Sequence, residues 1–234
     1  MLFDIDGTLV LTGGAGSRAM ALAFEDVFRV RDAFTGIAMP GRTDAWILSG
    51  AAEAHGIPAG ARGIERFRAA YLDHLSREIE RPAAGVRKGV MPGIRPLLEA
   101  LAVRPDVYLA LLTGNYEAGA RLKLEYFDLW RYFRCGAYGD HLPDRNALLP
   151  LALTRIVECD GPAVRPAQVV VVGDTPFDIA CALAGGARSL GVATGSHSAA
   201  ELRRAGADVV FETLADTAAV IEAIGALTGS SKEP

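Results

Sequence analysis

Short, nearly continuous apolar runs recur along the 234-residue chain and predict buried strands at 1–3, 107–112, 169–172, 189–192 and 208–211. Two of them are rich in Val, Leu and Ala without alternation, which is typical of strands covered on both faces of a parallel sheet. Between them, helical spacing of apolar residues predicts helices at 93–103, 116–126, 148–159, 177–184, 199–205 and 213–227. This alternation predicts an α/β fold, a doubly wound parallel sheet of Rossmann-like type.

The segment from 11 to 88 has a different pattern and contains no strand-like run. Met20, Phe24 and Phe28 lie at helical spacing, a second helical set runs from 64 to 79, and a third short helix surrounds Trp46. Gly and Pro residues mark both joins, as is usual at domain boundaries. We therefore expect a core domain of residues 1–11 and 89–234 and a small all-helical cap of residues 12–88, inserted after the first strand.

Composition narrows the class of protein. Half of the residues are hydrophobic, which allows a sizeable core, and the net charge of −4 argues against a nucleic-acid binder. No run approaches the roughly 20 apolar residues of a membrane span, and no signal-peptide pattern is visible. The three cysteines show no Cys-x-x-Cys spacing, so disulfides and a zinc site are not expected. We expect a cytoplasmic protein, a monomer or homodimer, without nucleic-acid or membrane partners.

Polar clusters follow three of the predicted strands. The first strand ends in Asp4-Ile5-Asp6-Gly7-Thr8, the second in Thr113-Gly114-Asn115, and the third in Gly173-Asp174-Thr175-Pro176-Phe177-Asp178. Ligands of open parallel sheets bind at the carboxyl ends of the strands, so the three clusters are expected to meet at one site. Only three residues precede Asp4, which leaves open a very short first strand or a chain that begins upstream.

The chemistry of these clusters indicates a hard divalent cation. Carboxylates so close together repel one another unless a cation lies among them, and Mg²⁺ prefers oxygen ligands and a substrate phosphate. One carboxylate could then attack phosphorus while a second moves the proton. A calcium loop of the EF-hand type is excluded, since Leu9 and Ala15 occupy the positions that require Gly and Glu.

In their order and spacing, these motifs resemble three of the four motifs of the haloacid dehalogenase-like hydrolase superfamily. The helical insert is similar to the type 1 cap of its phosphoglycolate-phosphatase-like and β-phosphoglucomutase-like members. The resemblance covers nearly the whole chain. It implies a Mg²⁺-dependent phosphatase that hydrolyses a small phosphorylated metabolite through an aspartyl-phosphate.

The resemblance also implies roles for individual residues. Asp4 is the nucleophile and a metal ligand, and Asp6 is the general acid and base, with its backbone carbonyl on the metal. Asp174 is the third protein ligand, and Asp178 supports the metal shell. The remaining expected contacts to the phosphoryl group and substrate involve Thr8, Thr113, Gly114 and Asn115.

The basic residue of the fourth motif is usually a lysine, and here the sequence departs from the family pattern. No lysine lies between Lys123 and Lys232, and the best match is Arg145, ahead of Arg134 and Arg155. An arginine can neutralise a phosphoryl group and bind it in a fork.

The sequence leaves three further points open. Arg42, in a cap loop, either binds an anionic group of the substrate distal to the phosphate or belongs to an ordinary helix start. A sugar phosphomutase of the β-phosphoglucomutase type is one alternative function, and a non-catalytic binding protein on the same fold is another. The natural substrate cannot be read from these residues.

Overall fold

The computed structural model describes residues 1–58, 60–81 and 85–229. Its main sheet has six strands in the order β5-β4-β1-β6-β7-β8, and each neighbouring pair is parallel. The strands are β1 (Leu2–Phe3), β4 (Ala110–Leu112), β5 (Gly136–Ala137), β6 (Val170–Gly173), β7 (Arg188–Val192) and β8 (Val209–Phe211). The predicted doubly wound parallel sheet is confirmed.

Alternate residues of the strands face two apolar layers. Phe3, Leu111 and Val172 lie on the face covered by α4 (Ile94–Ala102), α5 (Glu117–Tyr126) and α9 (Thr217–Thr228). Leu2 and Val171 lie on the opposite face, against α6 (Leu148–Glu158) and α7 (Pro176–Ala184). The helix α8 (Ala199–Arg204) packs beside β7 and β8. Because both faces are covered, the strands read as continuous apolar runs in the sequence.

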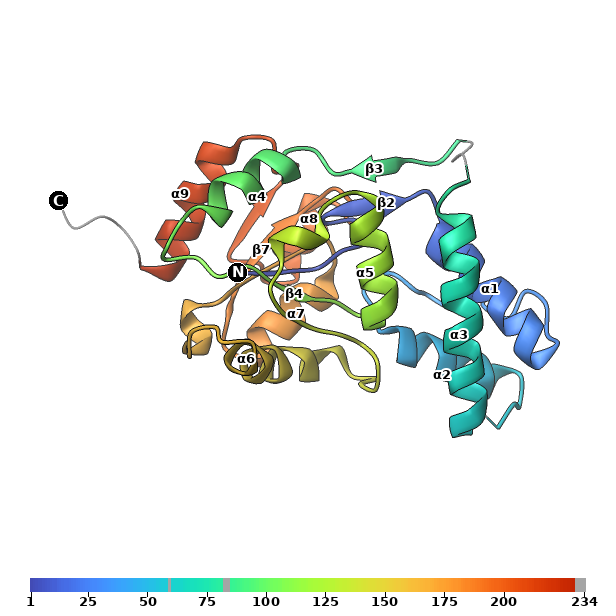
Figure 1. Ribbon diagram of the computed structural model, residues 1–234. Coiled ribbons are helices and arrows are strands. Elements are labelled where there is room, and N and C mark those ends of the chain that lie inside the picture. Colours follow the sequence, from blue (N-terminus) through green and yellow to red (C-terminus); the bar gives the residue numbers. More distant parts are fainter. Residues whose placement is uncertain (59, 82–84, 230–234) are drawn as a thin grey trace.

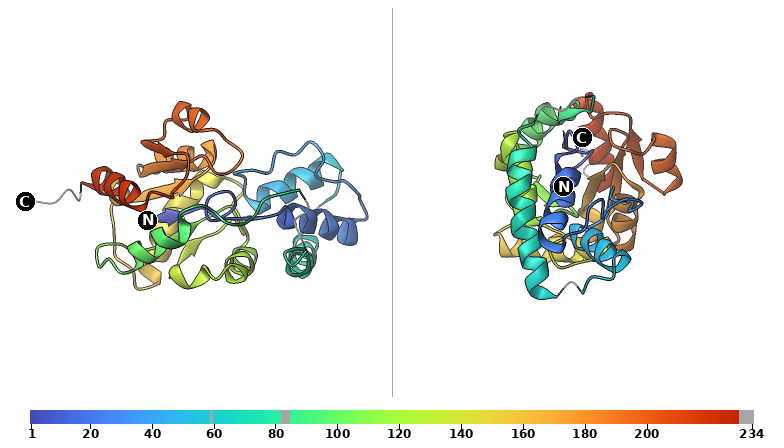
Figure 2. Two further views of the ribbon diagram at one scale, coloured as in Figure 1. Left: turned by 90° about the horizontal axis from the view of Figure 1, so that it is seen from above. Right: turned by 90° about the vertical axis from the view of Figure 1, so that its right-hand side faces the viewer.

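Three helices form a separate group on one side of the sheet (Figure 1): α1 (Ala15–Phe28), α2 (Asp44–Ala54) and α3 (Ala61–Glu78). They have an apolar core of their own, in which Phe24, Phe67 and Tyr71 are fully buried. Two further views show this group standing beyond one end of the core (Figure 2). Within the described part of the chain, no helix is both long and apolar enough to cross a membrane.

A short antiparallel ribbon joins the two parts. It pairs β2 (Val10–Thr12) with β3 (Lys88–Val90). The expectation that 11–88 holds no strand is therefore wrong at both of its ends, because a three-residue strand whose partner lies far along the chain has no local periodicity. The predicted boundaries at 11/12 and 88/89 fall in this ribbon, and the division into two domains stays a prediction.

The bounds and the number of the predicted strands also differ from the structure. The run 107–112 is a strand only from Ala110, and β5 was not predicted at all. Neither error moves a polar cluster, because each cluster follows the carboxyl end of its strand.

Candidate active site

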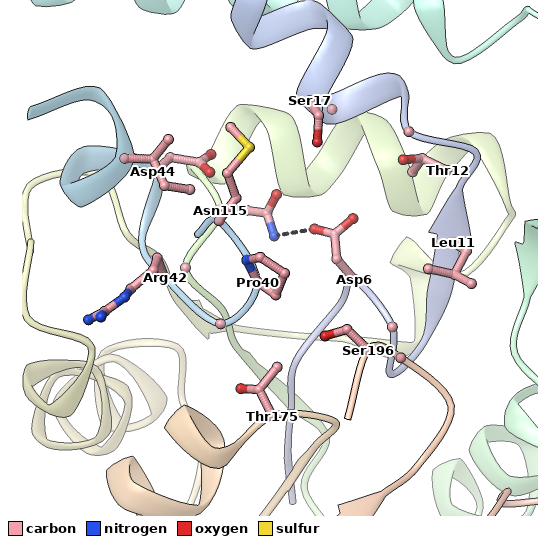
Figure 3. Close-up of a pocket in the computed structure, with 18 of the residues that line it drawn as sticks. Asp6, Leu11, Thr12, Ser17, Pro40, Arg42, Asp44, Asn115, Thr175 and Ser196 are labelled. Atoms are coloured by element: carbon pink, nitrogen blue, oxygen red, sulfur yellow. Dashed lines mark hydrogen bonds between the residues drawn. The ribbon is translucent and has the colours of Figure 1, made fainter. Parts of the chain in front are cut away.

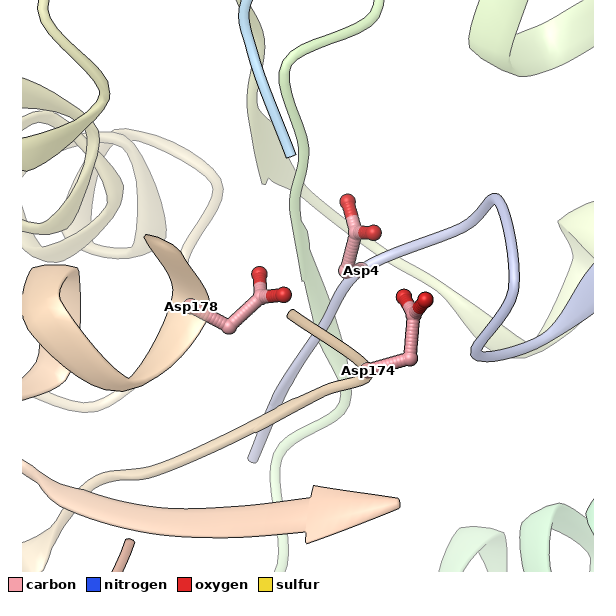
Figure 4. Close-up of side chains that lie close together, drawn as sticks. All are labelled: Asp4, Asp174 and Asp178. Atoms are coloured by element: carbon pink, nitrogen blue, oxygen red, sulfur yellow. The ribbon is translucent and has the colours of Figure 1, made fainter. Parts of the chain in front are cut away.

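Two adjacent strands bring the acidic clusters together. Strand β1 lies between β4 and β6, so Asp4 follows the central strand and Asp174 follows its neighbour. Asp178 lies in the first turn of α7. Each of these three carboxylates offers an oxygen, and these oxygens lie within 4.8 Å of one another. Figure 4 shows the side chain of Asp4 meeting those of Asp174 and Asp178, which come from the end of β6 and the start of α7.

Small residues leave room for Asp174. A Cβ atom on Gly7 would lie 2.4 Å from its Oδ2 atom, and one on Gly195 would lie 1.7 Å from the same atom. Gly7 also has a φ of 86°, a conformation that other residues rarely adopt. The Thr8 hydroxyl donates to Oδ1 of Asp174 at 3.1 Å and so holds the carboxylate in place.

The start of α7 orients Asp178. Thr175 is the N-cap residue, and its backbone N–H and its hydroxyl both donate to Oδ2 of Asp178, at 3.0 and 2.7 Å. This capping arrangement leaves the other oxygen of Asp178 free to face the site.

That oxygen is paired with Arg145. The guanidinium lies 2.5 Å from Oδ1 of Asp178 and 2.9 Å from Oδ1 of Asp4, and it also donates to the carbonyl of Gly41 at 3.1 Å. Arg145 is buried, on the short 3₁₀ turn Arg145–Ala147 before α6. The other two candidates lie elsewhere, since Arg134 is exposed and Arg155 pairs with glutamates at the surface.

Burial and crowding shift the protonation equilibria of these groups. Burial raises the pKa of Asp4 to about 6, with contributions from the charges of Asp178 and Asp6, although Arg145 opposes the shift. Burial and the charges of Asp178 and Asp4 raise the pKa of Asp174 well above its usual range. Burial lowers the pKa of Arg145, but the charges of Asp178 and Asp4 outweigh it, so this pKa rises.

The charge count fits a divalent cation. Three buried carboxylates face one guanidinium, so two negative charges stay uncompensated when all three are ionised. The ligand atoms are all oxygens, which suits a hard cation such as Mg²⁺. The residues present therefore fit the metal site that the sequence predicts.

The Asp6 carboxylate lies outside this cluster. Its Oδ2 atom accepts hydrogen bonds from Lys123 at 2.6 Å and from the Asn115 amide at 2.9 Å (Figure 3), and its side chain is 42% exposed. Its carboxylate is not one of the three that converge at the predicted metal site. The proposed contact of its backbone carbonyl with the metal stays a prediction.

Lys123 is a site residue that the sequence analysis missed. Its ammonium group also donates to Oδ1 of Asn115 at 2.6 Å, and its side chain is only 5% exposed. A signal was present, because Lys123 shares a helical face with the apolar residues Ala120 and Leu124. A lysine on the buried face of a helix requires a partner, and here the partner is Asp6.

The remaining predicted residues divide into two groups. Gly114 and Asn115 line the cavity described below. Thr113 is fully buried, and its hydroxyl accepts from the Asn115 amide at 2.8 Å, while Thr8 bonds to Asp174. Neither threonine is among the residues that line the cavity, and their expected contacts with the phosphoryl group stay predictions.

A cavity of about 590 Å³ opens above the carboxylates, between the sheet and the helical cap (Figure 3). Asp4, Asp6 and Asp174 line it on the core side. The cap contributes residues from α1, α2, α3 and the loop before α2. A second segment absent from the sequence prediction, the loop after β7, adds Gly195 and Ser196. The strand-end rule that located the other clusters applies to this loop as well.

Arg42 is among the lining residues, but its guanidinium is held between two aromatic rings. It lies 4.2 Å from the ring centres of both Trp46 and Phe177. In Figure 3 the side chain points away from Asp6. The expectation that Arg42 binds a distal anionic group stays a prediction.

Comparisons with known proteins indicate the family of this chain. Residues 145–217 fit the family model of HAD-hydrolase-like proteins. A phosphoglycolate phosphatase of Rhodospirillum rubrum is 30% identical, over 92% of this chain and 87% of its own. The Probable phosphatase IndB of Dickeya dadantii is 27% identical, over 98% and 96%. A solved hydrolase of Pseudomonas syringae has a TM-score of 0.68 at 22% identity, over 95% and 97%.

The chain therefore belongs to the haloacid dehalogenase-like hydrolases. Within this family it is a phosphatase of the phosphoglycolate-phosphatase-like type, a phosphoric monoester hydrolase. The alternative of a non-catalytic binding protein is set aside.

Proposed function

We propose that the protein is a Mg²⁺-dependent phosphatase that hydrolyses a small phosphorylated metabolite through an aspartyl-phosphate on Asp4. The observation that supports this most strongly is the meeting of the Asp4, Asp174 and Asp178 carboxylates beside a cavity that Asp4 and Asp174 line. Asp6 lines the same cavity, so a second carboxylate is available for proton transfer.

The carboxylates of Asp4 and Asp174 and the backbone carbonyl of Asp6 would hold the metal, with Asp178 supporting the shell. When bound, Mg²⁺ screens the carboxylates and draws charge from the phosphoryl oxygens. Arg145 complements it, because its fixed guanidinium holds Asp4 in place and presents positive charge beside the site of attack.

In the first step, an oxygen of Asp4 forms a bond to phosphorus and the bond from phosphorus to the substrate's ester oxygen breaks. Asp6, in its protonated form, gives its proton to that leaving oxygen, so the alcohol departs neutral. In the second step, Asp6 takes a proton from water, and the resulting hydroxide attacks the phosphorus. Inorganic phosphate leaves and Asp4 is restored.

The cap contributes by limiting access of water. Its loop before α2 rests on the core, where the Asp44 amide donates to the Gly114 carbonyl at 2.7 Å. A Cβ on Gly41 would lie 2.5 Å from the ring of Phe177, so this loop approaches the core as closely as glycine allows. Exclusion of bulk water protects the reactive aspartyl-phosphate from uncontrolled side reactions.

The test is substitution of the nucleophile. We expect Asp4→Asn to lower phosphate release from p-nitrophenyl phosphate with Mg²⁺ by about a thousandfold or more, because an amide does not form the acyl phosphate. Release is measured as inorganic phosphate, and folding is checked by thermal unfolding.

Asp160→Asn, the same change at an exposed position, is the matched control and should keep wild-type activity. Wild-type turnover in Asp4→Asn would contradict the nucleophile assignment. Conversion of a sugar phosphate to its isomer with little release of inorganic phosphate would instead favour the phosphomutase alternative.

A further inference from the structure

The wall of the cavity opposite the carboxylates is apolar. We define the apolar wall as the larger apolar side chains that line the cavity from α1, α2, α3 and the loop before α2: Met20, Ile37, Met39, Pro40, Ile47 and Tyr71. Ser17, Arg42 and Asp44 also line the cavity from these elements. Three residues of the apolar wall, Met20, Ile47 and Tyr71, belong to the buried core of the cap, so the surface that they present is fixed by packing. The leaving group of a phosphate ester held at Asp4 would meet this wall.

In the described part of the chain, two of the four cations that line the cavity are paired with carboxylates. Lys123 binds Asp6 and Asn115, and Arg145 binds Asp4 and Asp178. Within the described residues Arg42 forms no ion pair: its guanidinium lies between the rings of Trp46 and Phe177, and its buried Nε atom has no hydrogen-bond partner.

The fourth cation, Arg87, is exposed and donates to the carbonyl of Thr194. It is thus tied to the loop after β7 on the core side. Arg18 of the cap does not line the cavity and is paired with Glu78.

Acidic side chains in the cavity also disfavour an anionic leaving group. Asp44, at the start of α2, lines the cavity and is buried, and Asp6 lines the same cavity from the core side. A carboxylate on the leaving group would lose its water against the apolar wall and would face the carboxylate of Asp6. Burial of an unpaired charge is strongly unfavourable.

The cavity is also larger than a two-carbon acid requires. Its volume of about 590 Å³ lies within the range of about 300–1,000 Å³ that is typical of sites for drug-sized ligands. A phosphoryl group with glycolate would fill only part of it. The two methionines and Tyr71 provide surfaces that suit an alkyl chain or an aromatic ring.

We propose that the substrate is a phosphate monoester whose alcohol carries an uncharged, mainly apolar chain or ring, seated on the apolar wall. This inference rests on the proposed function, because it places the phosphoryl group at Asp4. It assigns the cap side of the cavity to recognition by apolar contact and not by pairing with an anionic group.

A series of n-alkyl phosphates tests this assignment. Ethyl, butyl and hexyl phosphate have leaving groups of similar basicity, so differences in kcat/KM report contacts of the chain. We expect kcat/KM to rise about twofold to fourfold for each added methylene, because burial of a methylene group is favourable. Butyl phosphate should exceed its carboxylate analogue, 4-phosphooxybutanoate, and phosphoglycolate by about tenfold or more. A flat series, or a preference for the carboxylates, would overturn the inference.

A charge placed on the wall gives a second test. Met39→Lys adds a cation at a half-buried loop position and should flatten the alkyl series while raising kcat/KM for phosphoglycolate about tenfold. Met39→Leu should keep the wild-type preference. Val103→Lys adds the same charge at an exposed position outside the cavity. Equal behaviour of Met39→Lys and Val103→Lys would contradict the proposed position of the leaving group.

Binding of phosphonates separates this inference from the proposed function. Their carbon–phosphorus bond is not hydrolysed, so calorimetry with Mg²⁺ measures affinity without turnover. Hexylphosphonate should bind at least about tenfold more tightly than phosphonoacetate. If no phosphate ester is hydrolysed but hexylphosphonate still binds more tightly than phosphonoacetate, the phosphatase proposal is wrong and the role of the apolar wall in binding is supported. If esters are hydrolysed but the order is reversed, only the inference on the leaving group fails.

Discussion

At the scale of single residues, the site contains two buried cations that pair with different carboxylates. Arg145 is fixed against Asp4 and Asp178, whereas Lys123 is fixed against Asp6. Each carboxylate with a proposed chemical step therefore has its own basic partner. Lys123 is best described as a positioning residue, since it reaches the reaction through Asp6 and Asn115.

Substitution of Lys123 should affect turnover more than binding. In Lys123→Met the Asp6 carboxylate loses the ammonium group that orients it. Because only proton transfer is then impaired, we expect kcat to fall about tenfold to a hundredfold with little change in KM. Steady-state kinetics with thermal unfolding of the same samples measures this. Arg121→Met, on the exposed face of the same helix, should leave both constants unchanged. A rise in KM with unchanged kcat would contradict a positioning role.

At the scale of elements, the start of α2 docks the cap onto the core. Thr43 caps the helix, as its hydroxyl accepts from the Trp46 amide at 3.1 Å. Asp44 accepts from the Tyr116 amide at 2.8 Å. Burial raises the pKa of Asp44 to about 7, with contributions from Asp6 and Asp140, although Lys123 and the Tyr116 amide oppose the shift. The docking helix therefore carries a carboxylate that is costly to ionise.

This pKa predicts a dependence of stability on pH. The folded state holds the Asp44 proton up to about pH 7, while the unfolded chain releases it near its ordinary pKa of 3.8. Asp44 therefore favours folding at low pH, and this contribution is lost as pH rises from about 4 to 7. In Asp44→Asn, whose amide oxygen can still accept from Tyr116, the free energy of unfolding should exceed that of wild type increasingly with pH. The limit is about 4 kcal/mol for three pKa units.

Urea unfolding at pH 5 and pH 8, for wild type and variant, measures this difference. Asp160→Asn, at an exposed position, should track the wild type at both values. An advantage of Asp44→Asn that shrinks as pH rises would show that Asp44 is not protonated in the folded state.

At the scale of the whole molecule, the site exists only where the two parts of the chain meet. The core supplies the carboxylates, and the cap supplies the apolar wall and the loop that closes on Gly114. The full cluster of uncompensated negative charge forms only in the folded structure, because residue 4 is far from residues 174 and 178 in an unfolded chain. A cation that binds there therefore stabilises the folded state.

Magnesium should accordingly raise thermal stability as well as support activity. At a free concentration one hundred times its Kd, the expected stabilisation is about 2.7 kcal/mol. Calorimetric melting with Mg²⁺ and after chelation measures it, and phosphate release should stop on chelation and return when Mg²⁺ is added again. Asp174→Asn should lose most of the melting shift, whereas Asp160→Asn should keep it. A full rate of phosphate release in excess chelator would exclude the metal site.

The sequence by itself determined the parallel sheet and the edge of that sheet at which the acidic residues gather. Buried parallel strands need apolar side chains on both faces, so the runs ending at Phe3, Leu112 and Val172 were visible in the linear pattern. Because ligands gather at strand ends, the residues that follow these runs could be assigned to one site. Arg145 came from the resemblance to the family, as the best match to the basic residue of the fourth motif, just before the helix predicted from Leu148.

Only the tertiary structure decided which groups pair and what the cavity offers to a substrate. The pairing of Lys123 with Asp6, the pairing of β2 with β3 and the orientation of Arg42 between two rings all join residues from distant segments. Such contacts depend on packing and leave no periodic signal in the chain. For the same reason the apolar wall, assembled from three helices and a loop, became visible only when the cap was folded over the core.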